Sequence, residues 1–152
     1  MTGDIEPKPE ICNCSALRQA ARHVTRFYDA FLSPAGLRAT QFSILAKLRQ
    51  RGPLTITALA AEMVMDRTTL GRNIRPLQRQ GLVAVASGGR DHRRKELHLT
   101  ETGLERLRAA GAPWREAQQR FEALFGIERA FALRQLLHIV SVTELASADA
   151  AE

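Results

Sequence analysis

Three arginines spaced for one face of a helix stand out in the 152-residue chain: Arg72, Arg75 and Arg79. At about 100° per residue, these three and Thr68 fall within about 60° of one another around a helix. Guanidinium groups bind phosphates and pair with guanine edges through two parallel hydrogen bonds. A narrow polar face with three arginines and no acid therefore predicts a helix that reads DNA.

The helix that must carry this face is predicted over Asp66–Gly81. Asp66 is a good N-cap residue and Gly81 is a natural stop. On the opposite side, apolar residues recur at i, i+4 and i+7, which predicts a stripe against a core: Leu70, Ile74 and Leu77. Pro76 lacks the amide that would bond the Arg72 carbonyl, so we expect a bend or a loosened turn there.

The surplus of positive charge is concentrated around this helix. The chain carries a formal charge of +6, and residues 66–100 alone hold eight Lys or Arg against three Asp or Glu. A local basic patch indicates a polyanionic partner. A merely solvated basic face would have the same charge, so the neighbouring elements must decide.

Two short helices precede the arginine helix. One is predicted over about Thr40–Gln50, ended by Gly52 and Pro53, and the next over about Thr55–Met63 with Thr55 as its cap. Only a brief turn at Val64 and Met65 follows before Asp66. Two short helices joined by a tight turn, the second more basic, are typical of a helix-turn-helix.

A basic hairpin is predicted after the arginine helix. Leu82–Ala86 has strand character and Leu97–Thr100 alternates, while the Gly-Gly pair and the basic run of residues 87–96 lie between them. Helix, turn, helix and basic hairpin in this order describe a winged helix. A flexible basic tip can reach the minor groove, where narrow A·T tracts concentrate negative potential.

The remaining helices have more apolar surface than this small unit can cover. One is predicted over about residues 15–32, and two fill about residues 101–145, with a kink near Ala112 caused by Pro113. The excess predicts contact with a second subunit. The expected fold is mainly α with a small β-hairpin: a flexible arm (1–14), a winged helix-turn-helix (about 40–100) between N- and C-terminal dimerisation helices, and a disordered tail (146–152).

Several function classes find no support in the sequence. There is no Ser/His/acid grouping, phosphate-binding loop or HExxH pattern, so we expect neither an enzyme nor a bound cofactor. The four histidines are isolated and lack the spacing of a zinc site. No apolar run approaches a membrane span, and the start lacks a signal-peptide layout, so no membrane partner and a cytoplasmic location are expected.

Local phrases along residues 15–145 resemble the MarR family of bacterial transcription regulators. They lie at the second helix, in the helix-turn-helix, in the hairpin and at the start of the fifth helix: Leu37-Arg-Ala-Thr-Gln-Phe42, Leu59-Ala-Ala-Glu-Met63, Asp66-Arg-Thr-Thr-Leu70, Leu77-Gln-Arg-Gln-Gly-Leu82, Asp91-His-Arg93 and Leu99-Thr-Glu-Thr-Gly103. Their order and spacing together are specific. The resemblance implies a homodimer that binds a pseudo-palindromic site on double-stranded DNA as a regulator, most simply a repressor.

The resemblance also implies roles for individual residues. Asp91 would orient the hairpin and Arg93 would enter the minor groove. Four residues would face bases or nearby phosphates in the major groove: Thr68, Thr69, Arg72 and Asn73. Five arginines would contact chiefly phosphates: Arg67, Arg75, Arg79, Arg90 and Arg94. Helical phase alone places Arg67, Thr69 and Asn73 on the flanks of the helix.

Regulators of this family often bind small aromatic or phenolic acids between the dimer helices and the winged domain. Candidate ligand-binding residues by position are His23, Tyr28, Phe31, Arg38, Phe42 and Trp114. A cationic side chain near aromatic rings would suit an aromatic carboxylate. Core or interface packing is the commoner role for each such residue.

Two alternative functions remain open. Cys12 and Cys14 lie just before the first predicted helix, so their oxidation could link subunits or shift the helix start, although close pairing at i, i+2 is strained. Two reduced thiols without a role are the commoner case in this compartment. A winged-helix module that binds nucleic acid or protein without base readout would use the same basic face.

Overall fold

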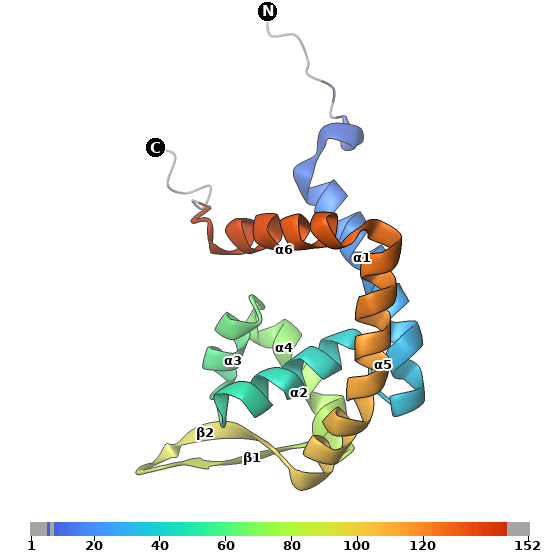
Figure 1. Ribbon diagram of the computed structural model, residues 1–152. Coiled ribbons are helices and arrows are strands. Elements are labelled where there is room, and N and C mark those ends of the chain that lie inside the picture. Colours follow the sequence, from blue (N-terminus) through green and yellow to red (C-terminus); the bar gives the residue numbers. More distant parts are fainter. Residues whose placement is uncertain (1–5, 7, 146–152) are drawn as a thin grey trace, which may run out of the picture.

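The computed structural model describes residues 6 and 8–145 and is mainly helical (Figure 1). The predicted tail at 146–152 and most of the predicted arm before residue 8 lie outside the described residues. The elements in chain order are a short 3-10 turn η1 (Pro9–Ile11), α1 (Asn13–Leu32), η2 (Ser33–Ala35), α2 (Ala39–Arg51), α3 (Ile56–Glu62), α4 (Arg67–Arg79), β1 (Val83–Gly88), β2 (Asp91–Leu99), α5 (Glu101–Phe125) and α6 (Ile127–Val142).

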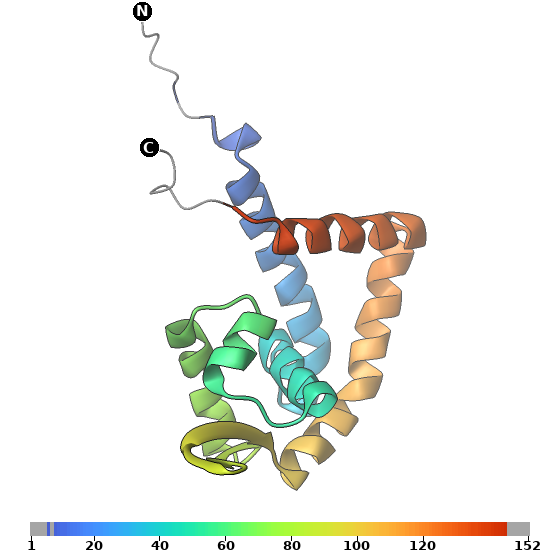
Figure 2. The same cartoon turned by 90° about the vertical axis from the view of Figure 1, so that its left-hand side faces the viewer.

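The helices and strands form two regions. In Figures 1 and 2, α2, α3, α4 and the β1–β2 hairpin gather at the lower end of the molecule, where the ends of α1 and α5 join them. We call this part the lobe. At the other end α6 turns away from the top of α5, and we call α6 with the adjoining halves of α1 and α5 the arm. The expected fold class, a winged helix-turn-helix flanked by terminal helices, is confirmed.

The hydrophobic core lies in the lobe. Its buried side chains come from every lobe element: Leu32, Leu37, Ile44, Leu45, Leu48, Leu59, Ala60, Leu70, Ile74, Leu77, Leu82, Val83, Leu97 and Ala110. The predicted stripe of α4 belongs to it, since Leu70 and Leu77 are 0% exposed and Ile74 is 3% exposed. Burial of this stripe leaves the arginine side of α4 facing outward.

The junction between the hairpin and α5 is tightly built. Thr100 caps α5 by accepting a hydrogen bond from the Gly103 amide at 2.9 Å, and its hydroxyl donates to the Gly81 carbonyl at 2.6 Å. A side chain at Gly103 would collide with the Leu82 carbonyl oxygen. The end of α4, the start of the hairpin and the start of α5 are therefore held at one point.

Two local expectations need correction. First, α1 begins at Asn13, two residues before the predicted start, because Cys12 caps it, and a 3-10 turn stands where a loose N-terminal arm was expected. The prolines at positions 76 and 113 lie inside α4 and α5, and both helices continue past them. One proline removes a single backbone hydrogen bond, which the flanking turns tolerate.

The second correction concerns the hairpin. Strand β2 starts at Asp91, so the basic run lies on a strand and the connection shrinks to Gly89 and Arg90, with Gly89 at φ +48°. The register pairs Val83 with Leu99 and Ser87 with Lys95, and it shifts between Ser87 and Gly88. Polar residues on both faces removed the alternation that reveals a strand, because this part of the hairpin covers no core.

Candidate nucleic-acid interface

The first turn of α4 is held by one carboxylate. The two Asp66 oxygens accept from the Thr69 amide at 2.8 Å and from the Thr69 hydroxyl at 2.6 Å. These hydrogen bonds, the hydroxyl's first, hold the pKa of Asp66 below its usual range. The predicted N-cap is thus present, and the Thr69 hydroxyl already donates its proton to Asp66.

The outer face of α4 carries its cations in the open. Thr68, Arg72, Arg75 and Arg79 are exposed, as helical phase requires, and Arg67 on the flank is exposed as well. In the part of the chain that is described, none of these arginines forms an ion pair with a carboxylate within 4 Å. Cations without a protein partner are available to an external anion.

The two flanking polar residues are partly occupied within the helix. Besides the bond from Thr69 to Asp66, the Asn73 side-chain amide donates to the Thr69 carbonyl at 2.9 Å. Both residues are half-buried. The structure therefore separates these two flank residues from Thr68 and Arg72, although the resemblance grouped all four for base contacts.

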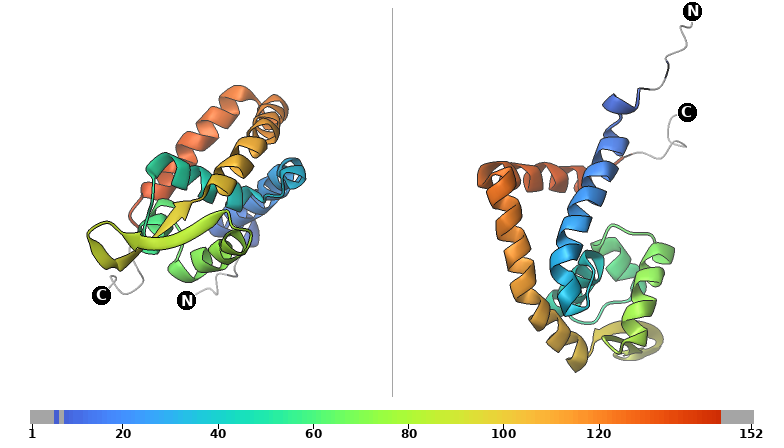
Figure 3. Two further views of the ribbon diagram at one scale, coloured as in Figure 1. Left: turned by 90° about the horizontal axis from the view of Figure 1, so that it is seen from below. Right: turned by 90° about the vertical axis from the view of Figure 1, so that its right-hand side faces the viewer.

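The hairpin supplies a second group of free cations. Arg90, Arg93 and Arg94 are exposed, and the Arg93 amide donates to the Asp91 carboxylate at 3.0 Å, which shapes the strand start. Seen from below, the hairpin extends past one side of α4 (Figure 3). Its base is tied to that helix, since the Leu82 amide donates to the Leu77 carbonyl at 2.9 Å. The exposed arginines of the hairpin and of α4 therefore lie on two adjoining elements.

Helix α3 is clamped to α2 by a charged cluster that sequence reasoning missed. The Glu62 carboxylate lies 2.8 Å from the Arg51 guanidinium and 3.4 Å from the Lys47 ammonium. Desolvation alone would raise the pKa of Glu62, but the charges and hydrogen bonds of Arg51 and Lys47 hold it below its usual range. Residues eleven or more positions apart on two helices leave no periodic signal, so only the packing reveals this contact.

The turn between α3 and α4 is strained. Val64 has a φ of +52° and its side chain is 72% exposed. A β-branched residue rarely adopts this left-handed conformation, which costs about 1–2 kcal/mol. The tight turn that the sequence predicted at Val64 and Met65 is present, but glycine would fit its backbone better.

The six predicted ligand residues are distributed over α1, the start of α2 and α5. Tyr28 and Phe31 lie on α1, where the Tyr28 hydroxyl donates to the Gln118 side chain at 2.6 Å and the Phe31 ring is 5.1 Å from Phe27. Phe42 and Trp114 instead stack on each other, with ring centroids 5.8 Å apart. His23 and Arg38 are exposed. The Phe27 ring also lies 6.4 Å from the Phe121 ring of α5. The aromatic rings of α1 and those of α2 therefore meet α5 at different positions.

The two cysteines flank the start of α1. Both are free and exposed, and the Cys12 sulfur accepts from the Ser15 amide at 3.4 Å as the N-cap. Within residues 6 and 8–145, no group of three or more His, Cys, Asp or Glu side chains is arranged to hold a metal ion. Over the same residues, no helix combines the length and apolar character of a membrane span.

The chain matches known transcription regulators. A model of the MarR family matches residues 37–95. The M. tuberculosis transcriptional regulator MosR is 36% identical, with 86% of this chain and 98% of that chain covered and a TM-score of 0.70. The chain belongs to the MarR family. MarR membership makes it a transcription regulator with a winged-helix DNA-binding fold, and MosR has also been solved in complex with DNA.

Two further proteins are similar to this chain. The regulator YwoH of Bacillus subtilis (strain 168) is 32% identical over 85 residues, which are 56% of this chain and 61% of YwoH, so the match spans under two thirds of that relative. The regulator CouR from Rhodococcus jostii RHA1, solved with p-coumaroyl-CoA, is 20% identical over 93% of this chain and all of its own, with a TM-score of 0.73. That likeness shows the shared fold.

Proposed function

We propose that this protein is a repressor that binds a pseudo-palindromic operator as a homodimer. The observation that carries the proposal is the outer face of α4, whose arginines have no carboxylate partner among the described residues, next to the equally free arginines of the hairpin. The DNA complex of MosR, a 36% identical relative, supports the same use of this fold. Occlusion of a promoter is the simplest action of such a dimer.

The proposed roles follow from how free each side chain is. Arg72 and Thr68 on the outer face of α4 read bases, Arg72 through the two-hydrogen-bond contact to guanine. Arg93 enters the minor groove, and Asp91 holds the strand that presents it. The remaining exposed arginines contact phosphates: Arg67, Arg75, Arg79, Arg90 and Arg94. Thr69 and Asn73 keep acceptor oxygens for DNA, but the Thr69 hydroxyl already donates to the cap residue Asp66 and the Asn73 amide already donates to the Thr69 carbonyl.

The homodimer rests on the apolar surface of the arm. On α6, Phe131 is 58% exposed, Leu136 62% and Val142 65%, and only Ala130 is buried. Surface of this kind is covered by protein in a stable molecule, and a second copy supplies an identical seam. Two recognition helices related by a two-fold axis read half-sites whose centres lie roughly 10 bp apart.

Duplex binding with competitor DNA tests this proposal. Selection from a random duplex library should enrich one inverted repeat, and the binding to that repeat should exceed binding to random DNA by about a thousandfold or more. Arg72→Ala should weaken the cognate complex and relax the preference at one base pair, whereas Arg93→Ala should weaken binding more broadly. Arg120→Ala, an exposed arginine on the upper half of α5, is the charge-matched control.

The alternative module without base readout predicts a different result. It would bind all duplexes alike, with a steep dependence on salt and no enriched sequence. Equal losses on cognate and random DNA for Arg72→Ala would contradict its base-reading role. No binding to any duplex would leave only a protein-interaction function for the basic face.

A small aromatic or phenolic acid is the proposed signal that releases the operator. Tyr28 of α1 and Phe42 of α2 each contact α5, through Gln118 and Trp114, while Phe31 packs on Phe27 within α1. His23 and Arg38 are exposed. An acid that entered between these helices would change how the arm sits on the lobe. A panel of hydroxybenzoic and hydroxycinnamic acids should include one that raises the melting temperature and weakens operator binding, and a panel without effect would exclude this class.

A second candidate signal is oxidation of the cysteines, favoured by the cap that Cys12 forms on α1. Hydrogen peroxide would take two electrons and two protons from two thiols, giving one disulfide and two waters. The thiol of Cys12 would lose its place at the helix start. Peroxide should then weaken operator binding by the wild type but not by the Cys12→Ser and Cys14→Ser double variant, and equal sensitivity of both proteins would rule the switch out.

A further inference from the structure

A chain of polar side chains joins three helices at the arm. The Tyr28 hydroxyl of α1 donates to the Gln118 carbonyl oxygen of α5 at 2.6 Å, and the Gln118 amide donates to Glu122 Oε1 at 3.1 Å. The Arg134 guanidinium of α6 donates to the same Glu122 oxygen at 3.1 Å. This chain, which we call the arm bridge, runs through otherwise aromatic surroundings of Phe27 and Phe121.

Each group of the arm bridge has one consistent role. Burial and the nearby Glu122 charge raise the pKa of Tyr28 by more than the Arg134 charge lowers it. The Tyr28 hydroxyl therefore keeps the proton that it donates. That donation turns the Gln118 amide nitrogen toward Glu122. The carboxylate then accepts from both sides, and the direction of the Arg134 side chain is set from α1 through α5.

Within one protomer, few other contacts of the described residues hold α6 in its direction. One residue, Gly126, separates α5 from α6, and its φ of +105° is a conformation that residues other than glycine rarely adopt. Of the α6 side chains, Ala130 is buried and Leu133 is half-buried, while the others are exposed. A helix with so little apolar burial depends on its polar anchor more than a core helix does.

We infer that Glu122 and Arg134, backed by Gln118 and Tyr28, set the direction of α6 and thereby the separation of the two recognition helices in the dimer. This inference rests on the proposed homodimer, in which α6 carries the seam. A fixed arm makes the protein selective for one spacing between operator half-sites. Glu122 and Arg134 are positioning residues for DNA recognition although neither lies on the lobe.

The test is a parallel selection of random duplex DNA by full-length wild type and Arg134→Gln. The wild type should enrich inverted repeats of one spacing. The variant should enrich the same half-site, while the share of sequences at the preferred spacing falls by about two- to fivefold, the scale of a partly exposed ion pair. Sedimentation should show both proteins as dimers at the concentration used.

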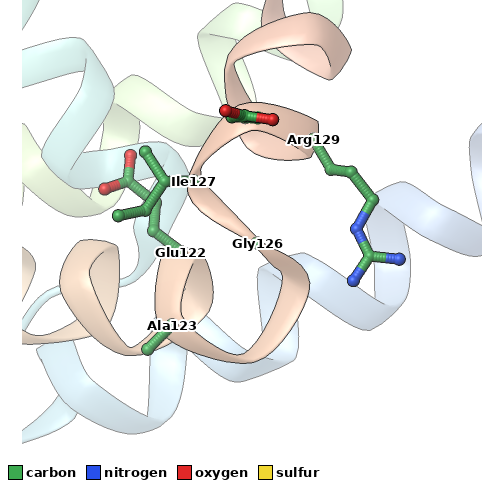
Figure 4. Close-up of a pocket in the computed structure, with 6 residues that line it drawn as sticks. Glu122, Ala123, Gly126, Ile127 and Arg129 are labelled. Carbon is green, nitrogen blue, oxygen red and sulfur yellow. The ribbon is translucent and has the colours of Figure 1, made fainter.

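Arg129→Gln is the matched control on the same helix. Arg129 lies 5.4 Å from the centroid of the Phe125 ring and points away from Glu122 at the α5–α6 corner (Figure 4). The same loss of charge there should leave the spacing preference unchanged. The double variant Glu122→Arg with Arg134→Glu restores the pair, and a flip of the Gln118 amide lets the Tyr28 oxygen accept instead. It should recover most of the wild-type spacing preference.

The outcomes distinguish the role of the arm bridge from the proposed homodimer on a palindromic operator. If the wild type prefers one half-site spacing and Arg134→Gln keeps that preference, the arm bridge does not set the direction of α6. The same holds if Arg129→Gln weakens the spacing preference as much as Arg134→Gln does. Either result leaves the proposed function intact. Failure of the charge-swapped double variant to recover the preference while it remains folded and dimeric also overturns it. A wild type that is monomeric or enriches no inverted repeat overturns the homodimer on a palindrome, and the arm bridge with it.

Discussion

The lobe and the arm use the same kinds of apolar residue in opposite ways. In the lobe, Leu70 and Leu77 of α4 are 0% exposed, whereas in the arm Leu136 and Phe131 of α6 are 62% and 58% exposed. Large apolar side chains on a stable surface have a partner, because their exposure to water is unfavourable. The lobe therefore carries a core of its own, whereas in the proposed homodimer the apolar surface of the arm is covered by the second subunit.

The largest expected effect is on lobe stability. Leu77→Ala removes a fully buried side chain and should lower the free energy of unfolding by about 2–5 kcal/mol, as cavity-forming substitutions do. Urea denaturation measures the change. Leu136→Ala on the exposed side of α6 is the matched substitution, and below the dimer dissociation constant it should change stability by less than about 0.5 kcal/mol. Equal losses in the two variants would contradict the division into lobe and arm.

The next effect is on association. Leu136→Glu places a charge on the exposed apolar side of α6 and should raise the dimer dissociation constant by about tenfold or more, since burying an unpaired charge is costly. Sedimentation equilibrium provides the measurement. Gln135→Glu adds the same charge one position earlier at a polar residue and should have a smaller effect. Unchanged association of the Leu136 variant would place the seam elsewhere.

A smaller effect concerns the cap of α4 and pH. Because hydrogen bonds from Thr69 lower the pKa of Asp66 in the folded protein, its contribution is present above the unfolded value of about 3.9 and is lost as the pH falls through the folded value. Asp66→Ala should lower the melting temperature at pH 7 and flatten its fall toward acid pH. Asp66→Asn, which can still cap, should keep most of the stability at pH 7. A melting temperature that falls equally steeply in Asp66→Ala would assign the acid sensitivity to other carboxylates.

The smallest effect is a gain. Val64→Gly relieves the left-handed backbone of the turn before α4, and after the entropy cost of glycine the free energy of unfolding should rise by about 0.5–1 kcal/mol. Thermal unfolding of the lobe's core reports it. Val64→Ala keeps the backbone restriction and should stabilise less. A loss of stability in the glycine variant would mean that the exposed Val64 side chain makes a contact worth more than the strain.

Much of the lobe was predictable because its signals are local. A cap acts within one turn and an apolar stripe repeats every three or four residues, so Asp66 and Thr55 could be recognised as caps from the sequence, and both form their expected bonds. The hairpin was located, but its long second strand was not, since residues that cover no core show no alternation. The roles of individual arginines on DNA remain predictions that the proposed experiments address.

The sequence by itself determined the arginine face of α4, the order of helices that makes the winged helix, and the surplus of apolar surface in the terminal helices, because each depends on residues only a few positions apart. Tertiary structure alone decided which distant groups meet. Tyr28 reaches Gln118 ninety positions away, Phe42 stacks on Trp114, and Arg134 returns to Glu122. Such contacts follow from how whole helices pack, and no spacing within one helix encodes that packing.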